Sequence, residues 1–143
     1  MEELSTSLKI ALADTFVMYF TAHSFHWNVT GLNFKEYHAF FGEIYDDCYS
    51  AVDPLAEHLR QLDVVAPKGL KEIISLAQHD ETSDAESAVK MIEALKELNE
   101  TVLLSLNHTF SLATKANEQG LANFLADRIG AHKKWRWQLK ASV

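Results

Sequence analysis

The stretch from Phe41 to Leu62, FGEIYDDCYSAVDPLAEHLRQL, carries apolar residues at alternating intervals of four and three. Because an α-helix turns once every 3.6 residues, residues at these intervals lie along one stripe of a single helix. The 4-3 spacing is typical of helices that pack together in a bundle. The stripe consists of Phe41, Tyr45, Cys48, Val52, Leu55, Leu59 and Leu62. The sequence therefore predicts one long bundle helix here, with Cys48 buried and unreactive.

A second periodic segment precedes this helix and covers residues 4–28, ending near Thr30-Gly31. Asn33 is a favoured N-cap residue, and Glu36 three residues later completes a capping box. We therefore expect the central helix to begin at Asn33. The apolar residues of the first segment recur at every fourth position: Leu8, Leu12, Phe16 and Phe20.

The remainder of the chain predicts one short helix and two long ones. After a break at Pro67 and Gly69, residues 70–77 form the short helix, and residues 79–83 form a polar loop. A capping box of Ser83 and Glu86 predicts the start of the third long helix, and the fourth covers residues 121–139. The expected fold is an all-α four-helix bundle in one domain, 1–143, with a short extra helix in the crossover between helices two and three.

The composition and charge of the chain limit the classes of function that it can have. The 143 residues are 48% apolar and 23% charged, enough for one sizeable core. The net charge of −7 disfavours a polyanionic partner. The chain lacks an apolar run long enough to span a membrane, and the acidic start MEELSTSLK predicts no secretory signal. A single cysteine excludes an intrachain disulfide and favours a reducing, cytoplasmic location.

A polar stripe lies beside the apolar one on the central helix: His38, Gly42, Asp46, Tyr49, Asp53, Glu57 and Arg60. Asp53 and Glu57, one turn apart, can present two carboxylates to one hard cation. His26 lies twelve residues before His38, at the end of the first helix. A simple solvated helix face is the alternative explanation of such a stripe.

The spacing of these candidate ligands constrains where a metal can bind. His38 and Asp53 are fifteen residues apart on one helix, which separates them by ~22 Å. Because metal–ligand bonds are only ~2 Å long, the two residues cannot share an ion within one chain. Two copies of the helix that pack antiparallel across a two-fold axis would bring them together. The sequence therefore predicts a metal site at a symmetric dimer interface.

Several motifs form one connected pattern: His26-Trp27-Asn28-Val29-Thr30-Gly31, then His38, then Asp53-Pro54-Leu55-Ala56-Glu57. The pattern resembles the Dps (DNA-protection-during-starvation) miniferritins in both its motifs and its spacings. The tail from His132 to Leu139 resembles the closing motif of the same family, so the resemblance covers roughly residues 8 to 140. It implies a ferritin-like bundle and a hollow homo-oligomeric shell of twelve subunits.

The resemblance also implies an activity, a ferroxidase that oxidises ferrous iron with peroxide or oxygen. The ferric mineral would be stored inside the shell, which protects against oxidative damage. His26 and His38 would be ligands from one subunit, with Asp53 and Glu57 from its neighbour. Glu57 would bridge two metal positions, and Trp27 would provide an oxidisable indole beside the site. Iron is the implied metal, although zinc or manganese suits the same ligands.

Gly42 departs from the family pattern, which has a carboxylate at this position. Without that side chain, we expect one well-occupied metal position, a weak second one and slower oxidation. Gly42→Asp should then raise both the second occupancy and the rate. The alternative function is a DNA-binding architectural cage with a degraded metal centre, because a basic cluster lies near the end of the chain: Lys133, Lys134, Arg136 and Lys140. Cations also suit a helix C-terminus, so we expect weak or absent DNA binding.

Overall fold

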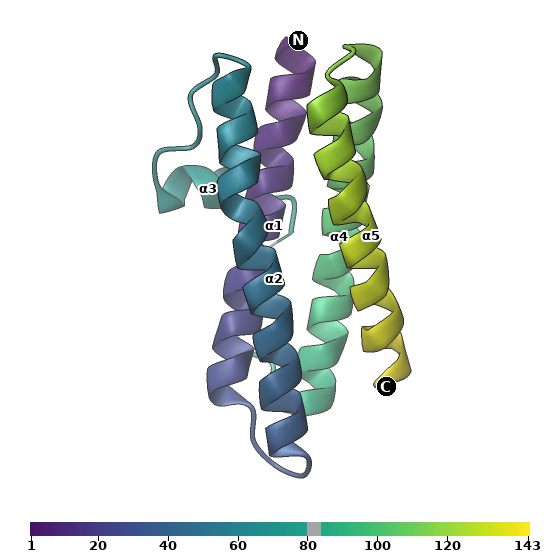
Figure 1. Cartoon of the computed structure of the whole chain (residues 1–143). Coiled ribbons are helices and arrows are strands. Elements are labelled where there is room, and N and C mark those ends of the chain that lie inside the picture. The colour runs from purple at the N-terminus through teal and green to yellow at the C-terminus, as the bar shows by residue number, and fades with distance from the viewer. Residues whose placement is uncertain (80–83) are drawn as a thin grey trace.

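The computed structural model describes residues 1–79 and 84–143, and every regular element of this part is a helix. The four long helices lie side by side as a bundle, with a short helix outside it (Figure 1). The predicted all-α four-helix bundle, with an extra helix between the second and third long ones, is confirmed. The helices are α1 (Glu2–Asn28), α2 (Phe34–Gln61), α3 (Leu70–Leu76), α4 (Ala88–Lys115) and α5 (Gln119–Ala141).

The connection between α2 and α4 crosses the length of the bundle. α2 ends at one end and α4 begins at the other, so these two helices point the same way (Figure 1). α3 lies within this connection and packs against α1. The backbone N–H of Gln78 donates to the buried Oδ1 of Asp14, 2.7 Å away, and so attaches the connection to α1.

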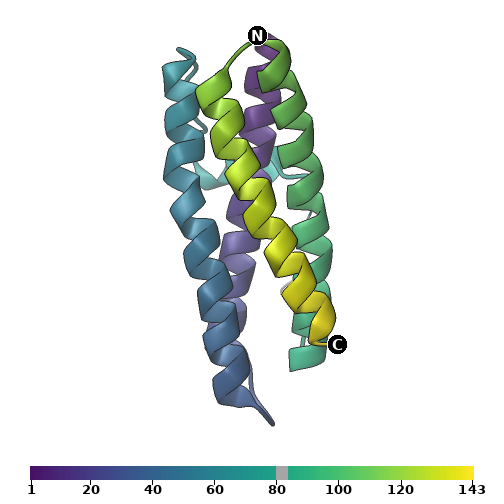
Figure 2. The same ribbon diagram turned by 45° about the vertical axis from the view of Figure 1, so that its right-hand side comes forward.

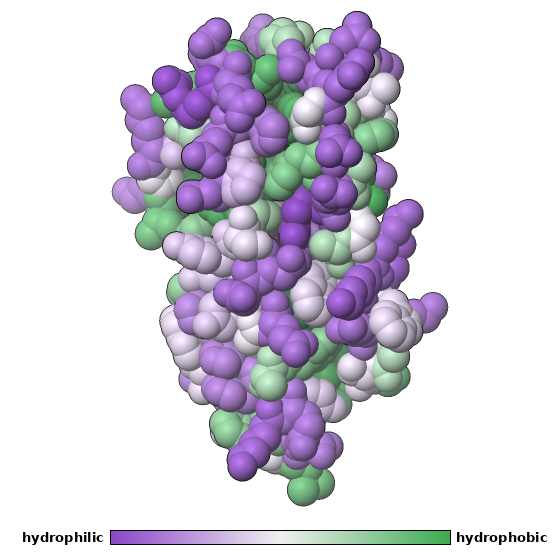
Figure 3. Space-filling view, viewed as in Figure 1, coloured by the Kyte–Doolittle hydropathy of each residue, from purple (hydrophilic) through white to green (hydrophobic). Residues whose placement is uncertain are grey.

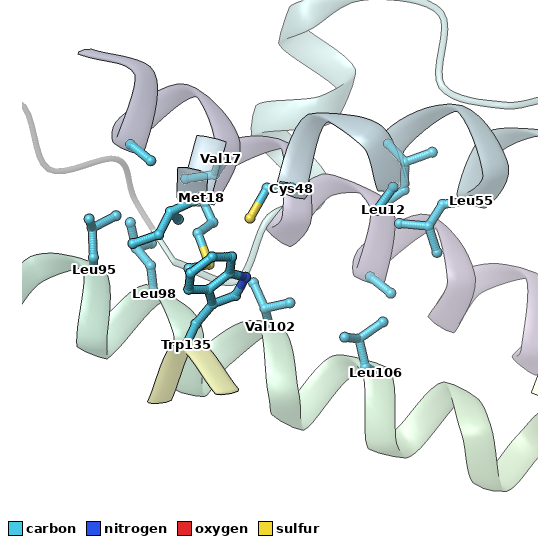
Figure 4. Packing of buried hydrophobic residues seen from close by; sticks show 14 of the residues in the cluster. Leu12, Val17, Met18, Cys48, Leu55, Leu95, Leu98, Val102, Leu106 and Trp135 are labelled. Atoms are coloured by element: carbon cyan, nitrogen blue, oxygen red, sulfur yellow. The ribbon is translucent and has the colours of Figure 1, made fainter. Parts of the chain in front are cut away.

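The core lies where α1 meets α2 on one side and α4 on the other, while α5 packs mainly against α4 (Figure 2). Phe41, Cys48, Leu55 and Leu59 of the predicted stripe on α2 are fully buried. Trp135 of α5 lies among the core residues of α1 and α4 (Figure 4). Cys48 is buried as predicted, and burial raises the pKa of its thiol to about 12, which disfavours the reactive thiolate.

The stripe predicted for α1 is correct at its start and wrong at its end. Leu8 and Leu12 are buried, but Phe20 is 42% exposed. Four residues turn a helix by about 400°, so a strict four-residue repeat drifts by about 40° at each step. Over three steps the repeat therefore leaves the core face, and Phe20 lies at the surface.

Both predicted capping boxes are wrong in detail. α4 begins at Ala88, after Glu86, and its N-cap is Ser87, whose hydroxyl accepts from the N–H of Lys90 at 3.2 Å. The other predicted partner, Ser83, lies outside the described residues. Asn33 is the N-cap of α2, as expected, but its side chain makes no capping hydrogen bond. Its backbone is left-handed, with φ of 63°, whereas a capping side chain normally extends from a β-region residue.

A buried polar network joins α2, α4 and α5. Arg128 donates from both terminal nitrogens to the Asp47 carboxylate, at 2.8 and 2.9 Å, and Trp135 Nε1 donates to the same group at 2.7 Å. Arg128 also donates to His132 Nε2 at 3.0 Å, and His132 Nδ1 donates to Asn99 Oδ1 at 2.8 Å. His132 is thus structural, and the network holds α5 in register with its neighbours.

The surface carries both polar and apolar residues (Figure 3). Polar residues cover much of the face in Figure 3, and apolar residues reach the surface at its left edge, over α3. Within the described residues, no helix is long and apolar enough to cross a membrane.

Candidate metal centre

His26 and His38 meet where α1 ends and α2 begins, at the closed end of the α1–α2 hairpin (Figure 1). Their rings stack, with centroids 3.7 Å apart and planes 16° apart. Nδ1 of His26 lies 2.6 Å from the carbonyl oxygen of His38, and Nδ1 of His38 lies 2.6 Å from the carbonyl oxygen of His26. The hairpin therefore holds the two imidazoles through a reciprocal pair of hydrogen bonds.

These hydrogen bonds decide which ring nitrogen is available to a metal. A carbonyl oxygen only accepts, so Nδ1 of each ring must carry the hydrogen. In a neutral imidazole, Nε2 then keeps its lone pair free. Metal-binding histidines generally donate their second nitrogen to such an acceptor, which fixes the tautomer and the orientation of the ring. In both histidines, Nε2 is therefore the nitrogen left free to bind a metal.

Gly42 lies directly against one of these candidate ligands, His26. A Cβ atom at position 42 would lie 3.1 Å from Nδ1 and 3.2 Å from Cε1 of His26. Such a contact is tighter than ordinary van der Waals packing, so the His26 ring would have to shift. The absence of a carboxylate at position 42 is therefore linked to the histidine pair, because a side chain at this position would compete with the His26 ring for space.

Asp53 and Glu57 lie farther along α2, one turn apart and exposed on the surface. α2 continues without a break through Pro54, so the two carboxylates keep their helical phase. The structure brings His26 and His38 together, with Trp27 next to them in the sequence, but leaves the carboxylates apart from them. Among the residues described in one chain, no three His, Cys, Asp or Glu side chains gather closely enough to hold a metal ion.

Aromatic rings surround His23, one turn before His26, in what we call the tyrosine–histidine cluster: Tyr19, His23, Trp27, Tyr45 and Tyr49. The ring of Tyr45 stacks on His23 with centroids 3.8 Å apart and planes 5° apart. Trp27 packs on His23 at 4.3 Å, and the hydroxyl of Tyr19 lies 2.9 Å from His23 Nδ1. Sequence reasoning noted Trp27 and listed Tyr45 and Tyr49 only as members of the two helix stripes. It missed their association with Tyr19 and His23, although these two residues are four positions apart on one helix face.

The environment favours the uncharged forms of Tyr19 and His23. Burial, with a smaller effect of the neighbouring His26, lowers the pKa of His23. Burial also raises the pKa of Tyr19, and Tyr49 and Tyr45 add to the effect. A neutral imidazole and a protonated phenol therefore face each other at neutral pH.

An exposed apolar patch continues from this cluster across α1, α2 and α3. Leu70 and Ile74 of α3 are 64% and 62% exposed, although both are large apolar residues. Contiguous exposed apolar surface marks an interaction site more often than scattered apolar residues do. The patch and the pocket at its centre are lined by Phe16, Val17, Tyr19, Phe20, Tyr49, Leu70 and Ile74.

Comparison with known sequences relates the chain to ferritin-like proteins. A family model described as a ferritin-like domain matches residues 6–143. The DNA protection during starvation protein of Brevibacillus brevis is 30% identical over 132 residues, which cover 91% of this chain and 87% of that protein.

Solved structures agree with the sequence relatives. A Dps protein from Vibrio cholerae O1, described as a member of a broad superfamily of ferritin-like diiron-carboxylate proteins, matches with a TM-score of 0.93 at 28% identity. The match covers 98% of this chain and 88% of that one. Dps from Thermosynechococcus elongatus matches with a TM-score of 0.94 at 27% identity, over 98% of this chain and 89% of that one.

Proposed function

Because the chain belongs to the Dps family of ferritin-like proteins, which supports a role in iron storage and protection, we propose that it is a ferroxidase. It oxidises ferrous iron with peroxide or oxygen and stores the ferric mineral in a hollow dodecameric shell. The substrate is the iron itself, bound between two subunits. This activity removes ferrous iron and peroxide together and thereby limits oxidative damage.

The observation that carries the proposal is the reciprocal hydrogen bonding of His26 and His38. Two imidazoles are held with Nε2 free before any metal arrives, so the chain loses little side-chain entropy on binding. The pair nevertheless supplies only two ligands, and a divalent ion needs more.

A second copy of the chain supplies the remaining ligands. The exposed apolar patch lies on α1 and α2, which carry the candidate ligands, and on the neighbouring α3, and a second copy would cover it. If α2 packs against α2 of the partner in antiparallel orientation, Asp53 and Glu57 of one chain face His26 and His38 of the other. Each two-fold interface then holds two equivalent sites.

The ligand set determines how many ions bind. His26 with Asp53 and Glu57 makes a three-ligand position, whereas His38 with a shared oxygen of Glu57 makes a weak second one. Gly42 adds nothing to the second position. We therefore expect one well-occupied iron at each site. Zinc and manganese accept the same imidazole and carboxylate ligands and would compete with iron.

The same proposal locates the protein in the cytoplasm. The single cysteine is buried, and ferrous iron is the soluble form in a reducing compartment.

Iron uptake tests the proposal. Ferrous iron and peroxide are added to the iron-free protein, and the soluble ferric product is followed by absorbance while light scattering reports the mass of the assembly. We expect a soluble brown product in an assembly of about twelve chains of 16.2 kDa. A Glu57→Gln variant should assemble equally and form little product. A stable monomer, or ferric precipitation at the rate of protein-free buffer, would contradict the proposal.

A further inference from the structure

Peroxide accepts two electrons, whereas a single ferrous ion supplies one. A site with one well-occupied metal position therefore needs a second electron donor close by. The tyrosine–histidine cluster adjoins that position. Resting on the function proposed above, we propose that Tyr19 and His23 form a proton-coupled redox pair, in which Tyr19 supplies the second electron and His23 holds its proton.

An electron can reach the metal position through rings in contact. The ring centroid of Tyr45 lies 5.2 Å from that of His26, which is the histidine of the proposed three-ligand metal position. Tyr45 also stacks on His23 at 3.8 Å and lies 6.2 Å from Tyr19. Tyr45 thus bridges the metal ligand and the proposed donor, with no aliphatic residue needed between the rings.

Tyr19 is the tyrosine on which the radical would form. A phenol releases its proton when it loses an electron. Its oxidation is therefore favoured where a base is positioned to accept that proton. The chain has four tyrosines. Among the described residues, the hydroxyl of Tyr19 is hydrogen-bonded to an imidazole, with His23 Nδ1 2.9 Å away. Tyr49 packs on Tyr19 at 4.9 Å and adds polarisable ring surface to the same position.

The proposed step balances in atoms and electrons. One ferrous ion loses one electron and becomes ferric, and Tyr19 loses one electron and becomes a neutral phenoxyl radical. The phenolic O–H bond breaks, and its proton moves to Nδ1 of His23. Peroxide takes up the two electrons and two protons from solvent, its O–O bond breaks, and two water molecules leave.

The pair then returns to its starting state with the next ion. Once the ferric ion has moved on, a second ferrous ion binds and reduces the radical, and His23 returns the proton to Tyr19. Two ferrous ions are thus consumed for each peroxide, although they bind in succession. The peroxide is fully reduced at each turnover, and hydroxyl radical is not released.

Electron paramagnetic resonance tests the pair directly. The assembled iron-free protein receives one ferrous ion per site and excess peroxide and is frozen within the first turnover, and ferric iron is measured in the same samples. We compare the wild type with Tyr19→Phe, with His23→Phe, which keeps the ring stack but removes the base, and with Tyr37→Phe. Tyr37 is the matched control because it packs against Phe41, away from the cluster.

We expect a tyrosyl radical signal in the wild type and in Tyr37→Phe, formed together with ferric iron. Tyr19→Phe and His23→Phe should lose the signal while still forming ferric iron, and a spin trap should then detect hydroxyl radical. A tyrosyl signal of unchanged size in Tyr19→Phe, with normal ferric iron, would overturn the redox pair and leave the ferroxidase proposal standing. No ferric iron in the wild type would overturn both.

Discussion

His26 and His38 each donate a hydrogen bond from Nδ1 to the other residue's backbone carbonyl, at 2.6 Å in both directions. Twelve residues separate them, and the α1–α2 hairpin makes the exchange mutual. Because each ring is held by the backbone carbonyl of the other residue, loss of one histidine side chain removes that ring's own hydrogen bond and the ring stack but leaves the other ring's hydrogen bond in place. Each substitution should therefore weaken metal binding mainly by removing its own imidazole, since the remaining one keeps its tautomer.

The contact between Gly42 and His26 leads to a prediction about the missing carboxylate. Gly42→Ala adds only a Cβ atom, which presses on the His26 ring, so we expect weaker binding of the first metal. Gly42→Asp adds the same atom together with a carboxylate. We therefore expect Gly42→Asp to bind more metal at the second position than Gly42→Ala does, as measured by titration calorimetry with ferrous iron under anaerobic conditions. Two metals of equal affinity per site in the wild type would contradict the argument.

The Asp47–Arg128 pair predicts a specific loss of stability. Burial tends to raise the pKa of Asp47, but the hydrogen bonds and charge of Arg128, with the Trp135 N–H, lower it overall. Arg128→Met leaves a partly buried carboxylate without its cation and should lower the free energy of unfolding by about 3 kcal/mol. The same change at Arg136, which pairs with Glu100 at the surface, should cost less than about 1 kcal/mol.

A double variant separates charge from packing at this pair. Asp47→Asn keeps an oxygen that can accept from Trp135 and removes the charge. Arg128→Met with Asp47→Asn should therefore be more stable than Arg128→Met alone in urea denaturation. Strictly additive losses would show that the two side chains do not interact energetically.

His132 predicts an acid sensitivity of the fold. Burial, followed by the charge of Arg128, lowers the pKa of His132 from 6.5 to about 3. Between these values the unfolded chain binds the proton and the folded chain does not, so stability falls as the pH falls. The slope contributed by His132 is at most about 1.4 kcal/mol per pH unit. His132→Gln should reduce this slope in denaturation curves between pH 6.5 and 4, measured beside the wild type, and an unchanged slope would contradict the argument.

DNA binding should be weak or absent at physiological salt. The chain carries a net charge of −7, and Arg136 of the basic cluster already pairs with Glu100. We expect no retardation of plasmid DNA at neutral pH in ~150 mM salt without magnesium. Retardation that disappears in a Lys133→Gln/Lys134→Gln variant would instead support the DNA-binding cage.

Much of the fold could be predicted because helix periodicity is local. The stripe from Phe41 to Leu62 predicted a bundle helix, and its central residues are buried. The start of α4 was harder to predict, because Ser83 and Ser87 both precede acidic or helix-forming residues and periodicity does not choose between them. The resemblance carried by His26, Trp27 and His38 is confirmed by the family match.

The candidate site was less predictable, because its details depend on contacts between helices. The spacing of His26 and His38 indicated ligands but not the reciprocal hydrogen bonds, which exist only once the hairpin closes. The contact of Gly42 with His26 was equally invisible. The pair of Asp47 and Arg128, 81 residues apart, has no sequence signature.

Subunit mixing tests the central claim, that each metal site takes its histidines from one chain and its carboxylates from another. One variant carries His26→Ala and His38→Ala, and a second carries Asp53→Asn and Glu57→Gln. Neither should oxidise iron alone. In a mixed dimer, the histidines of the second variant meet the carboxylates of the first, so one of the two sites is complete. Random reassembly at equal amounts should therefore restore about a quarter of wild-type ferroxidation. Mixed assemblies that remain as inactive as their parents, or a parent that is active alone, would contradict the claim.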